Sequence, residues 1–294
     1  MAMTSTSRVI SSVATGLISR NLKTMTIIDQ LVELIRRTTS SLPGDVVRAL
    51  EIARGNEKKG SSAEIVLSTV LENCAIAKKN STPLCQDTGT LSFYVSESLM
   101  AKVTRDKVEK AVAKATKLGY LRRNSIDALT GASYDDNCGP GSPLIYYCKR
   151  RGVTLIMKGG GSENMSRQYS LPDASLGAGR DLEGVRKCVL DAVANAQGYG
   201  CAPGILGVAV GGDRGTGFAV AKEQLLRPLD EKMTEFEKQL LDEANSLSIG
   251  PMGLGGATTL LGVKTAFRSR LPASFFVTIA YMCWACRRCT INIK

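Results

Sequence analysis

Three cysteines lie in short stretches that suit metal-binding loops. Cys85 stands in Pro-Leu-Cys-Gln-Asp-Thr-Gly, Cys201 in Gly-Tyr-Gly-Cys-Ala-Pro-Gly and Cys283 in Tyr-Met-Cys-Trp-Ala. Thiolates are soft ligands that favour zinc or iron–sulfur clusters. Our hypothesis is that the fold gathers the three around one iron–sulfur cluster and leaves one iron open to a substrate, as a Lewis acid. Each cysteine, considered alone, could instead be a structural residue packed in the protein interior.

The composition narrows the chemistry further. The 294 residues include nine cysteines and no histidine. The absence of histidine excludes the usual base at neutral pH, the Ser–His and Cys–His nucleophile pairs and every metal site that contains histidine. An odd number of scattered cysteines does not suit a disulfide framework. A metal in this protein would therefore be bound by cysteine, aspartate or glutamate. We expect some of the other cysteines to be buried structural thiols.

The last three cysteines form a C-x-x-C-x-x-C run, Cys283, Cys286 and Cys289. Such a run is part of a ferredoxin-type cluster site. However, no C-x-x-x-C-P completes the pattern, and two arginines separate the last two cysteines. We therefore expect Cys283 to be a ligand and Cys286 and Cys289 to be incidental.

Two glycine-rich stretches resemble anion-binding loops. Gly198, Gly200 and Gly204 miss the dinucleotide-binding fingerprint by one residue and follow an expected helix, so that function is excluded. The segment 158–164, Lys-Gly-Gly-Gly-Ser-Glu-Asn, lacks the Gly-Lys-Ser/Thr ending of a P-loop. Its successive glycine N–H groups could form a nest for a carboxylate, and a plain turn after a strand is the alternative.

The chain has a formal net charge of +11. A basic surface attracts nucleic acid or small dianions, or is simply solvated. Aromatic residues are few and do not alternate with basic ones, so we expect no nucleic-acid partner. No apolar run is long enough to span a bilayer, so we expect no membrane partner either.

Residues 1–26 differ in composition from the rest. They contain Arg8, Arg20 and Lys23, many serines and threonines, and no acidic residue. This pattern is typical of a mitochondrial transit peptide, and a disordered tail is the alternative. We therefore expect a mitochondrial (matrix) or related organellar location, with residues 27–294 forming one catalytic domain.

The elements that must position these residues alternate irregularly. Patterns of apolar residues predict helices near 28–35, 43–50, 61–79, 105–118, 181–197 and 230–246. They predict strands near 91–95, 144–148, 153–157, 205–210 and 275–281, the second and third of which we expect to form a hairpin. The fold class predicted is α+β: a mixed α/β core with the cluster-binding loops at strand and helix ends.

Four motifs in order resemble one family. They lie at 83–89, 158–164, 203–208 (Pro-Gly-Ile-Leu-Gly-Val) and 250–256 (Gly-Pro-Met-Gly-Leu-Gly-Gly). Together they are similar to the class I (iron–sulfur) fumarate hydratases and the related L-tartrate dehydratases. The resemblance covers about residues 27–289 and corresponds to the alpha subunit or N-terminal domain of that family.

The resemblance implies a [4Fe-4S] cluster held by Cys85, Cys201 and Cys283, whose fourth iron binds the substrate hydroxyl and a carboxylate. It also implies a substrate-binding group, which consists of Gln86, Asp87, Arg122 and Gly160. In the family the arginine clamps one carboxylate, as suits a guanidinium fork, and a glycine of 159–161 offers its N–H to the other.

The resemblance further implies a hydro-lyase that interconverts fumarate and malate, as in the tricarboxylic acid cycle. The alternatives are an L-tartrate dehydratase alpha subunit and an inactive scaffold or binding relative. The chain stops soon after Cys283, whereas the family's catalytic base comes from a C-terminal domain or beta subunit. We therefore expect a beta-type partner, a small dicarboxylate substrate, a homo-oligomer of the assembled enzyme, and no base in this chain.

Two departures from the family pattern concern substrate positioning. A histidine is usual before Ala-Ser ahead of the third cysteine, but residues 270–274 here read Arg-Leu-Pro-Ala-Ser. The usual Asp-Asn-Thr-Gly reads Asp-Asn-Cys-Gly, with Cys138 in place of threonine. Neither change touches a cluster ligand.

Overall fold

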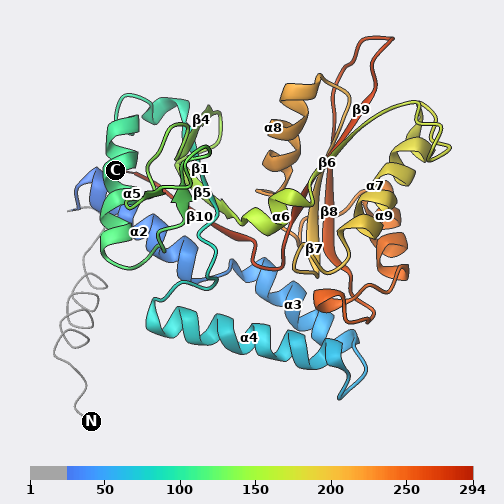
Figure 1. Cartoon of the computed structure of the whole chain (residues 1–294), viewed down its shortest axis with the longest axis horizontal. Helices are drawn as coiled ribbons and strands as arrows, with labels where there is room; N and C mark the ends of the chain where they lie inside the picture. Colours follow the sequence, from blue (N-terminus) through green and yellow to red (C-terminus); the bar gives the residue numbers. More distant parts are fainter. Residues whose placement is uncertain (1–24, 294) are drawn as a thin grey trace. The chain divides into compact units, whose positions relative to one another are not determined.

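A computed structural model describes residues 25–293 of the chain (Figure 1). Nearly all of the transit-peptide-like segment, 1–26, lies outside the described residues. The described chain divides into two compact units. Unit 1 comprises the residues up to Ser40, Asn80–Met157 and the chain from Cys289; unit 2 comprises Ser41–Lys79 and Lys158–Arg288. That both act as the one catalytic domain expected over 27–294 stays a prediction.

Unit 1 is built on a four-stranded sheet. Its strands are β1 (Thr90–Ser96), β4 (Leu144–Cys148), β5 (Val153–Lys158) and β10 (Arg287–Ile291), in the order β10-β5-β1-β4. β1 and β4 are parallel, with Phe93 opposite Ile145. Six of the seven residues of β1 and all six of β5 are buried, so both strands are covered on both faces.

Two helices cover this sheet. They are α2 (Ile27–Ser40) and α5 (Arg105–Lys117). Leu31 and Ile35 of α2 and Val108 of α5 are fully buried in the same apolar cluster as Phe93 and Leu155 of the sheet. A short 3₁₀ turn, Glu97–Leu99, and a small hairpin of β2 (Ser125–Ile126) and β3 (Ser133–Tyr134) complete the unit.

The hairpin expected from residues 144–157 does not form. β4 and β5 are both strands, but β1 lies between them in the sheet. β1 is buried on both faces and has two edges to pair, so it takes the central position and leaves the less buried β4 at the rim. The prediction was wrong because it paired two strands that are neighbours in the sequence. In the fold, the buried strand β1 takes a central position in the sheet and separates them.

Unit 2 contains a second four-stranded sheet. Its strands are β6 (Arg167–Ser170), β7 (Gly204–Val210), β8 (Leu260–Phe267) and β9 (Phe276–Met282), in the order β6-β9-β7-β8. β7 is parallel to β8 and antiparallel to β9. All seven residues of β7 are buried, which confirms a strand covered on both faces.

Helices lie on both faces of the second sheet (Figure 1). On one face, α7 (Leu182–Ala196) and α9 (Glu235–Ser246) bury Val189 and Leu240 against Leu206 and its strand neighbours. On the other face lies α8 (Arg214–Gln224). A Cβ on Gly207 would come within 2.0 Å of the Ala221 carbonyl oxygen, so α8 sits directly on the strand backbone.

The remaining elements of unit 2 are α3 (Gly44–Asn56), α4 (Ser62–Asn80), the short α6 (Gly160–Asn164) and a 3₁₀ turn, Pro251–Gly253. Pro43 is the residue before α3, and the Ser61 hydroxyl accepts the Glu64 N–H at the start of α4. The α+β fold class is confirmed. Within the described residues, no helix is both long and apolar enough to cross a membrane.

Candidate active site

In unit 1, Cys85 lies in the middle of the loop that joins α4 to β1. Its sulfur accepts the Asp87 N–H at 3.4 Å, and the Asp87 carboxylate accepts the N–H of Gly89 at 2.8 Å. Asn124 donates its side-chain amide to the same carboxylate at 3.1 Å. The loop therefore holds the thiol and the carboxylate two residues apart in a fixed orientation.

A second contact brings Arg122 to the same loop. The Thr88 hydroxyl donates to the Arg122 carbonyl oxygen at 2.8 Å and lies 3.0 Å from the Arg122 N–H. Within the described part of the chain, the Arg122 guanidinium makes no hydrogen bond or ion pair, and its residue is exposed. Gln86 is exposed as well. The structure thus brings together the unit 1 members of the predicted site: Cys85, Gln86, Asp87 and Arg122.

Asn137, which was not among the predicted site residues, holds this arrangement in place. It is 1% exposed and adopts a left-handed φ of 62°. Its Oδ1 accepts the N–H groups of Asn124 and Ser125 at 3.1 and 3.2 Å, and its Nδ2 donates to the Arg122 carbonyl at 2.9 Å. Asparagine tolerates a left-handed backbone better than most residues, which is the signal that could have identified it.

Cys138, the departure from the family pattern, follows Asn137. Burial raises the pKa of its thiol to about 11, and the sulfur donates to the Glu109 carbonyl at 3.5 Å. A threonine hydroxyl could make the same kind of contact. The substitution therefore leaves the Asn137 contacts intact.

In unit 2, Cys201 and Cys283 lie next to each other. The N–H of Trp284 donates to the Cys201 carbonyl at 3.2 Å, which joins the end of β9 to the loop before β7. Cys201 is exposed with a left-handed φ of 55°, and Cys283 is 9% exposed. Both cysteines stand at strand ends, where the sequence placed them.

The glycines around Cys201 make room for a tyrosine. A Cβ on Gly200 or Gly204 would lie 2.3 or 2.5 Å from atoms of the Tyr281 ring. Burial raises the pKa of the Tyr281 hydroxyl, and the Cys283 and Cys201 thiols raise it further. The small size of Gly200 and Gly204 therefore accommodates the Tyr281 side chain.

The glycine-rich segment 158–164 borders the same region. A Cβ on Gly161 would lie 3.7 Å from the Tyr199 carbonyl oxygen, so the loop that contains Gly160 runs beside the Cys201 loop. Lys158 is buried before the glycines, and Glu163 follows them. Their side chains form an ion pair of 2.6 Å that closes the loop.

The two other cysteines of the C-x-x-C-x-x-C run do not join Cys283. The Cys286 thiol is buried and donates weakly to the Leu225 carbonyl at 3.9 Å, whereas Cys289 packs against the apolar core of unit 1. That Cys286 and Cys289 are incidental to a cluster stays a prediction. Among residues 25–293, no group of three or more Cys, Asp or Glu side chains surrounds a position for a single metal ion.

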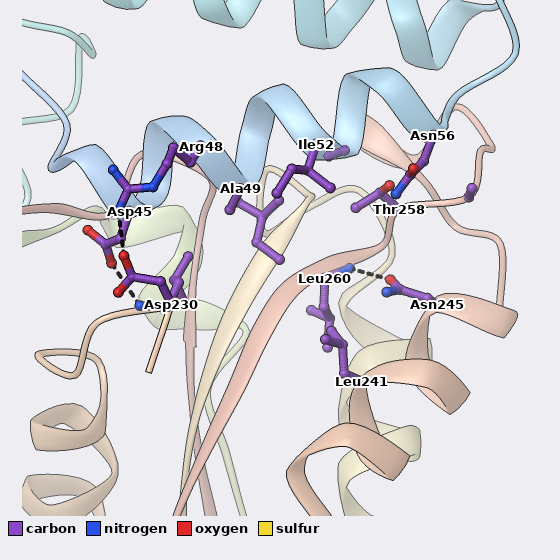
Figure 2. Close-up of a pocket in the computed structure, with 14 residues that line it drawn as sticks. Asp45, Arg48, Ala49, Ile52, Asn56, Asp230, Leu241, Asn245, Thr258 and Leu260 are labelled. Atoms are coloured by element: carbon purple, nitrogen blue, oxygen red, sulfur yellow. Dashed lines mark hydrogen bonds and ion pairs between the residues drawn. The ribbon is translucent and has the colours of Figure 1, made fainter. Parts of the chain in front are cut away.

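A separate pocket of about 340 Å³ lies in unit 2 between α3, α9 and the start of β8 (Figure 2). Ala49, Ile52 and Leu241 give it an apolar wall. Several of its polar groups bind other residues of the protein: Asn245 accepts the Leu260 N–H at 2.8 Å, and Arg48 pairs with Asp230. No predicted site residue lines this pocket, so we do not assign the chemistry to it.

Comparison with known proteins identifies the family. The model of the family described as fumarate hydratase (Fumerase) matches residues 28–292. The chain belongs to the fumarate hydratase family. The resemblance inferred from the four motifs is thereby confirmed.

Individual relatives carry two kinds of name. A Geobacillus stearothermophilus protein named as a class I fumarate hydratase is 45% identical over 279 residues, which are 90% of this chain and 54% of that protein. A Methanocaldococcus jannaschii protein named as an L(+)-tartrate dehydratase alpha subunit is 36% identical over 92% of this chain and 98% of its own length. The alpha subunit of L(+)-tartrate dehydratase from Escherichia coli K12 is 28% identical over 90% and 91%.

These relatives correct one prediction. They come from bacteria and an archaeon, which have no mitochondria, so the mitochondrial location expected from residues 1–26 was wrong. The place in the tricarboxylic acid cycle that the resemblance implied is not supported either. Serine, threonine and arginine are also common in segments that are not targeting signals, and composition does not separate the two.

Proposed function

We propose that this chain is the cluster-binding part of a hydro-lyase that adds water to fumarate to give malate, reversibly. The observation that carries the proposal is that the Trp284 N–H donates to the Cys201 carbonyl oxygen. This bond brings Cys201 close to Cys283, 82 residues further along the chain, in unit 2 of a fumarate hydratase family member. The chain spans only about half the length of the Geobacillus relative, so its activity, substrate and partner are proposals.

The cysteines suit an iron–sulfur cluster. Such clusters are held by cysteine thiolates, and the proposed ligands are Cys85, Cys201 and Cys283. Cys201 is exposed, and the Tyr281 ring packs against Gly200 and Gly204 on either side of it. When bound through three thiolates, a [4Fe-4S] cluster offers one iron without a protein ligand, which acts as a Lewis acid toward substrate oxygens.

The chain's own residues bind and orient the dicarboxylate. The Arg122 guanidinium, exposed beside the Cys85 loop, is proposed to hold one carboxylate as a bidentate fork. Gly160 is proposed to contact the other through its backbone, and Gln86 and Asp87 to border the substrate. Asp87 is an acceptor in a fixed orientation, because Gly89 and Asn124 hold its carboxylate.

Hydration of fumarate places a hydroxyl on one alkene carbon and a proton on the other, with no change in net oxidation state. The proton step needs a positioned acid or base, a contribution of about 10²–10⁴-fold in rate. We propose that a beta-type chain or domain supplies this group. The support is that two relatives of nearly the same length are named as alpha subunits.

L-tartrate is the second candidate substrate. Identity is higher with the relative named for fumarate hydratase, but coverage of the whole relative is higher with those named for tartrate dehydratase. Both reactions move water between a hydroxy diacid and an alkene, so the same carboxylate contacts serve either. The two sites would differ only next to the second hydroxyl group, which tartrate has and malate lacks.

An anaerobic assay decides between these functions. The chain is reconstituted with iron and sulfide, combined with a beta-type chain equivalent to the second half of the Geobacillus relative, and tested with fumarate and with L-tartrate. We expect a brown protein that converts fumarate faster, and much slower turnover without the partner. Faster turnover of tartrate would select the second candidate. A colourless protein without iron would leave only an inactive binding relative.

A further inference from the structure

A buried lysine is anchored beside the strand that carries Cys283. The Lys158 side chain, at the end of β5, is 5% exposed, and its Nζ lies 2.6 Å from Glu163 Oε2. The same Nζ donates to the Ser166 hydroxyl at 3.4 Å, and that hydroxyl accepts the Tyr281 N–H at 3.2 Å. Tyr281 and Cys283 are two residues apart, so the ammonium group is tied to the end of β9 that carries the ligand.

The charges around Lys158 do not cancel. Glu163 is shared between Lys158 and Lys222, which extends from α8. One carboxylate thus faces two ammonium groups, and the network retains one positive charge. Burial lowers the pKa of Lys158, but Glu163, by its charge and hydrogen bond, and the Cys283 thiol oppose that shift.

A buried charge needs a compensating partner, because removing it from water costs several kcal/mol. Glu163 compensates Lys158 only in part, since it also serves Lys222. The additional negative groups that the proposed function brings here are the Cys283 thiolate and a doubly charged substrate. The excess positive charge of the network would stabilise both the Cys283 thiolate and the dicarboxylate.

We infer that Lys158 is a positioning residue whose buried positive charge offsets the charge of the Cys283 ligand and of an incoming dicarboxylate; the inference rests on the proposed function. Groups outside the ligand shell tune a metal site, and net charge near the sulfurs sets the reduction potential of an iron–sulfur cluster. Glu163 fixes the ammonium in place and closes the glycine loop that contains Gly160.

The test compares K158M with K158R in the full chain, reconstituted anaerobically. K158M removes the charge and keeps a long apolar side chain, whereas K158R keeps the charge. In K158M we expect the equilibrium constant for one-electron reduction of the cluster by dithionite to fall about tenfold, which is about 59 mV. With the beta-type chain added, KM for the dicarboxylate should rise about tenfold, with a smaller change in kcat. K158R should stay close to the wild type.

K264M is the matched control. Lys264 is another buried lysine of unit 2, at 1% exposure, and its Nζ donates to the Glu231 carbonyl at 3.0 Å. Its charged neighbours are Arg227, Glu237, Glu231 and Asp230. K264M should lower the unfolding temperature without moving the reduction potential.

An unchanged potential in K158M, or an equal shift in K158M and K158R, would overturn the inference. If K158M does not fold, the shift must appear in K222M, which removes the outer cation of the same network, and its absence there is equally decisive. A wild-type chain that binds no iron refutes the proposed function instead, so the two failures are distinguishable.

Discussion

Among individual side chains, the cysteines divide into proposed ligands and packed thiols. C85S, C201S and C283S should each lose the cluster, because a site with three thiolates has no spare ligand. C286S and C289S should retain it, since those sulfurs contact backbone carbonyls elsewhere. Iron and sulfide content after anaerobic reconstitution measures the outcome. Loss of iron in C286S together with retention in C283S would show that the ligand assignment is wrong.

Asn137 is expected to control the position of Arg122. N137A leaves the N–H groups of Asn124 and Ser125 without their acceptor, at a cost of about 1–3 kcal/mol. We expect KM for the dicarboxylate to rise about tenfold or more, with iron content unchanged, because each 1.4 kcal/mol lost is a factor of ten in binding.

The control for N137A is D127A in the neighbouring hairpin. Asp127 accepts the Thr130 N–H at 2.8 Å and the Tyr134 hydroxyl at 3.0 Å, so its loss loosens the hairpin without removing a contact to Arg122. Equal KM values for N137A and the wild type would show that Asn137 serves only stability.

Among strands and helices, the junction of β7 with β9 depends on small residues. In G204A the new Cβ would meet the buried Tyr281 ring at 2.5 Å, and such overpacking costs about 1–3 kcal/mol. We expect a lower free energy of unfolding and weaker iron binding. G55A in α3, where no atom lies within 4 Å of the added Cβ, should instead be neutral or stabilise by up to about 1 kcal/mol. Urea denaturation of both variants checks the contrast.

Glu237 joins α9 to β8 and makes that junction sensitive to acid. It is fully buried, caps α9 through the Thr234 N–H at 3.0 Å, and accepts the Thr265 N–H at 2.7 Å. Burial raises the pKa of this carboxyl, but those N–H groups and Arg227 outweigh burial and hold the pKa below its ordinary value.

A lowered pKa in the folded state means that the ionised carboxylate stabilises the fold above the unfolded pKa of about 4.3, and that this stabilisation is lost as the pH falls through the folded pKa. E237Q should therefore cost about 1–3 kcal/mol at pH 7 and lose less further stability on acidification than the wild type. Unfolding curves at pH 7 and below pH 4 measure the difference. Parallel pH profiles for the two proteins would contradict it.

For the whole chain, the proposed open iron predicts sensitivity to oxygen. Air should release iron and abolish hydro-lyase activity in the assembled enzyme, and ferrous iron with a thiol should restore both. Cluster absorbance and activity followed over the same exposure measure this. Activity that survives prolonged air after the absorbance has gone would show that the cluster takes no part in the reaction.

The sequence by itself determined the fold class, most of the elements and the family. Strong local signals explain this: the apolar face of α2, the buried run of β7, and the four motifs are each readable from neighbouring residues. It did not reveal α8, β8 or β10. Two glycines in α8 weaken its helical pattern. β8 and β10 are strands whose pairing partners are far away in the sequence.

Only the tertiary structure decided the contacts that make the site. The sheet order that separates β4 from β5, the role of Asn137 and the Lys158–Glu163–Lys222 network all join residues from different elements. The glycines near Cys201 show the reason. Their spacing indicates that something must approach the backbone closely, but only packing shows that the approaching group is Tyr281. Closely spaced glycines in the sequence indicate that another group packs against the backbone there. Which residue packs there depends on contacts between segments that are far apart in the sequence.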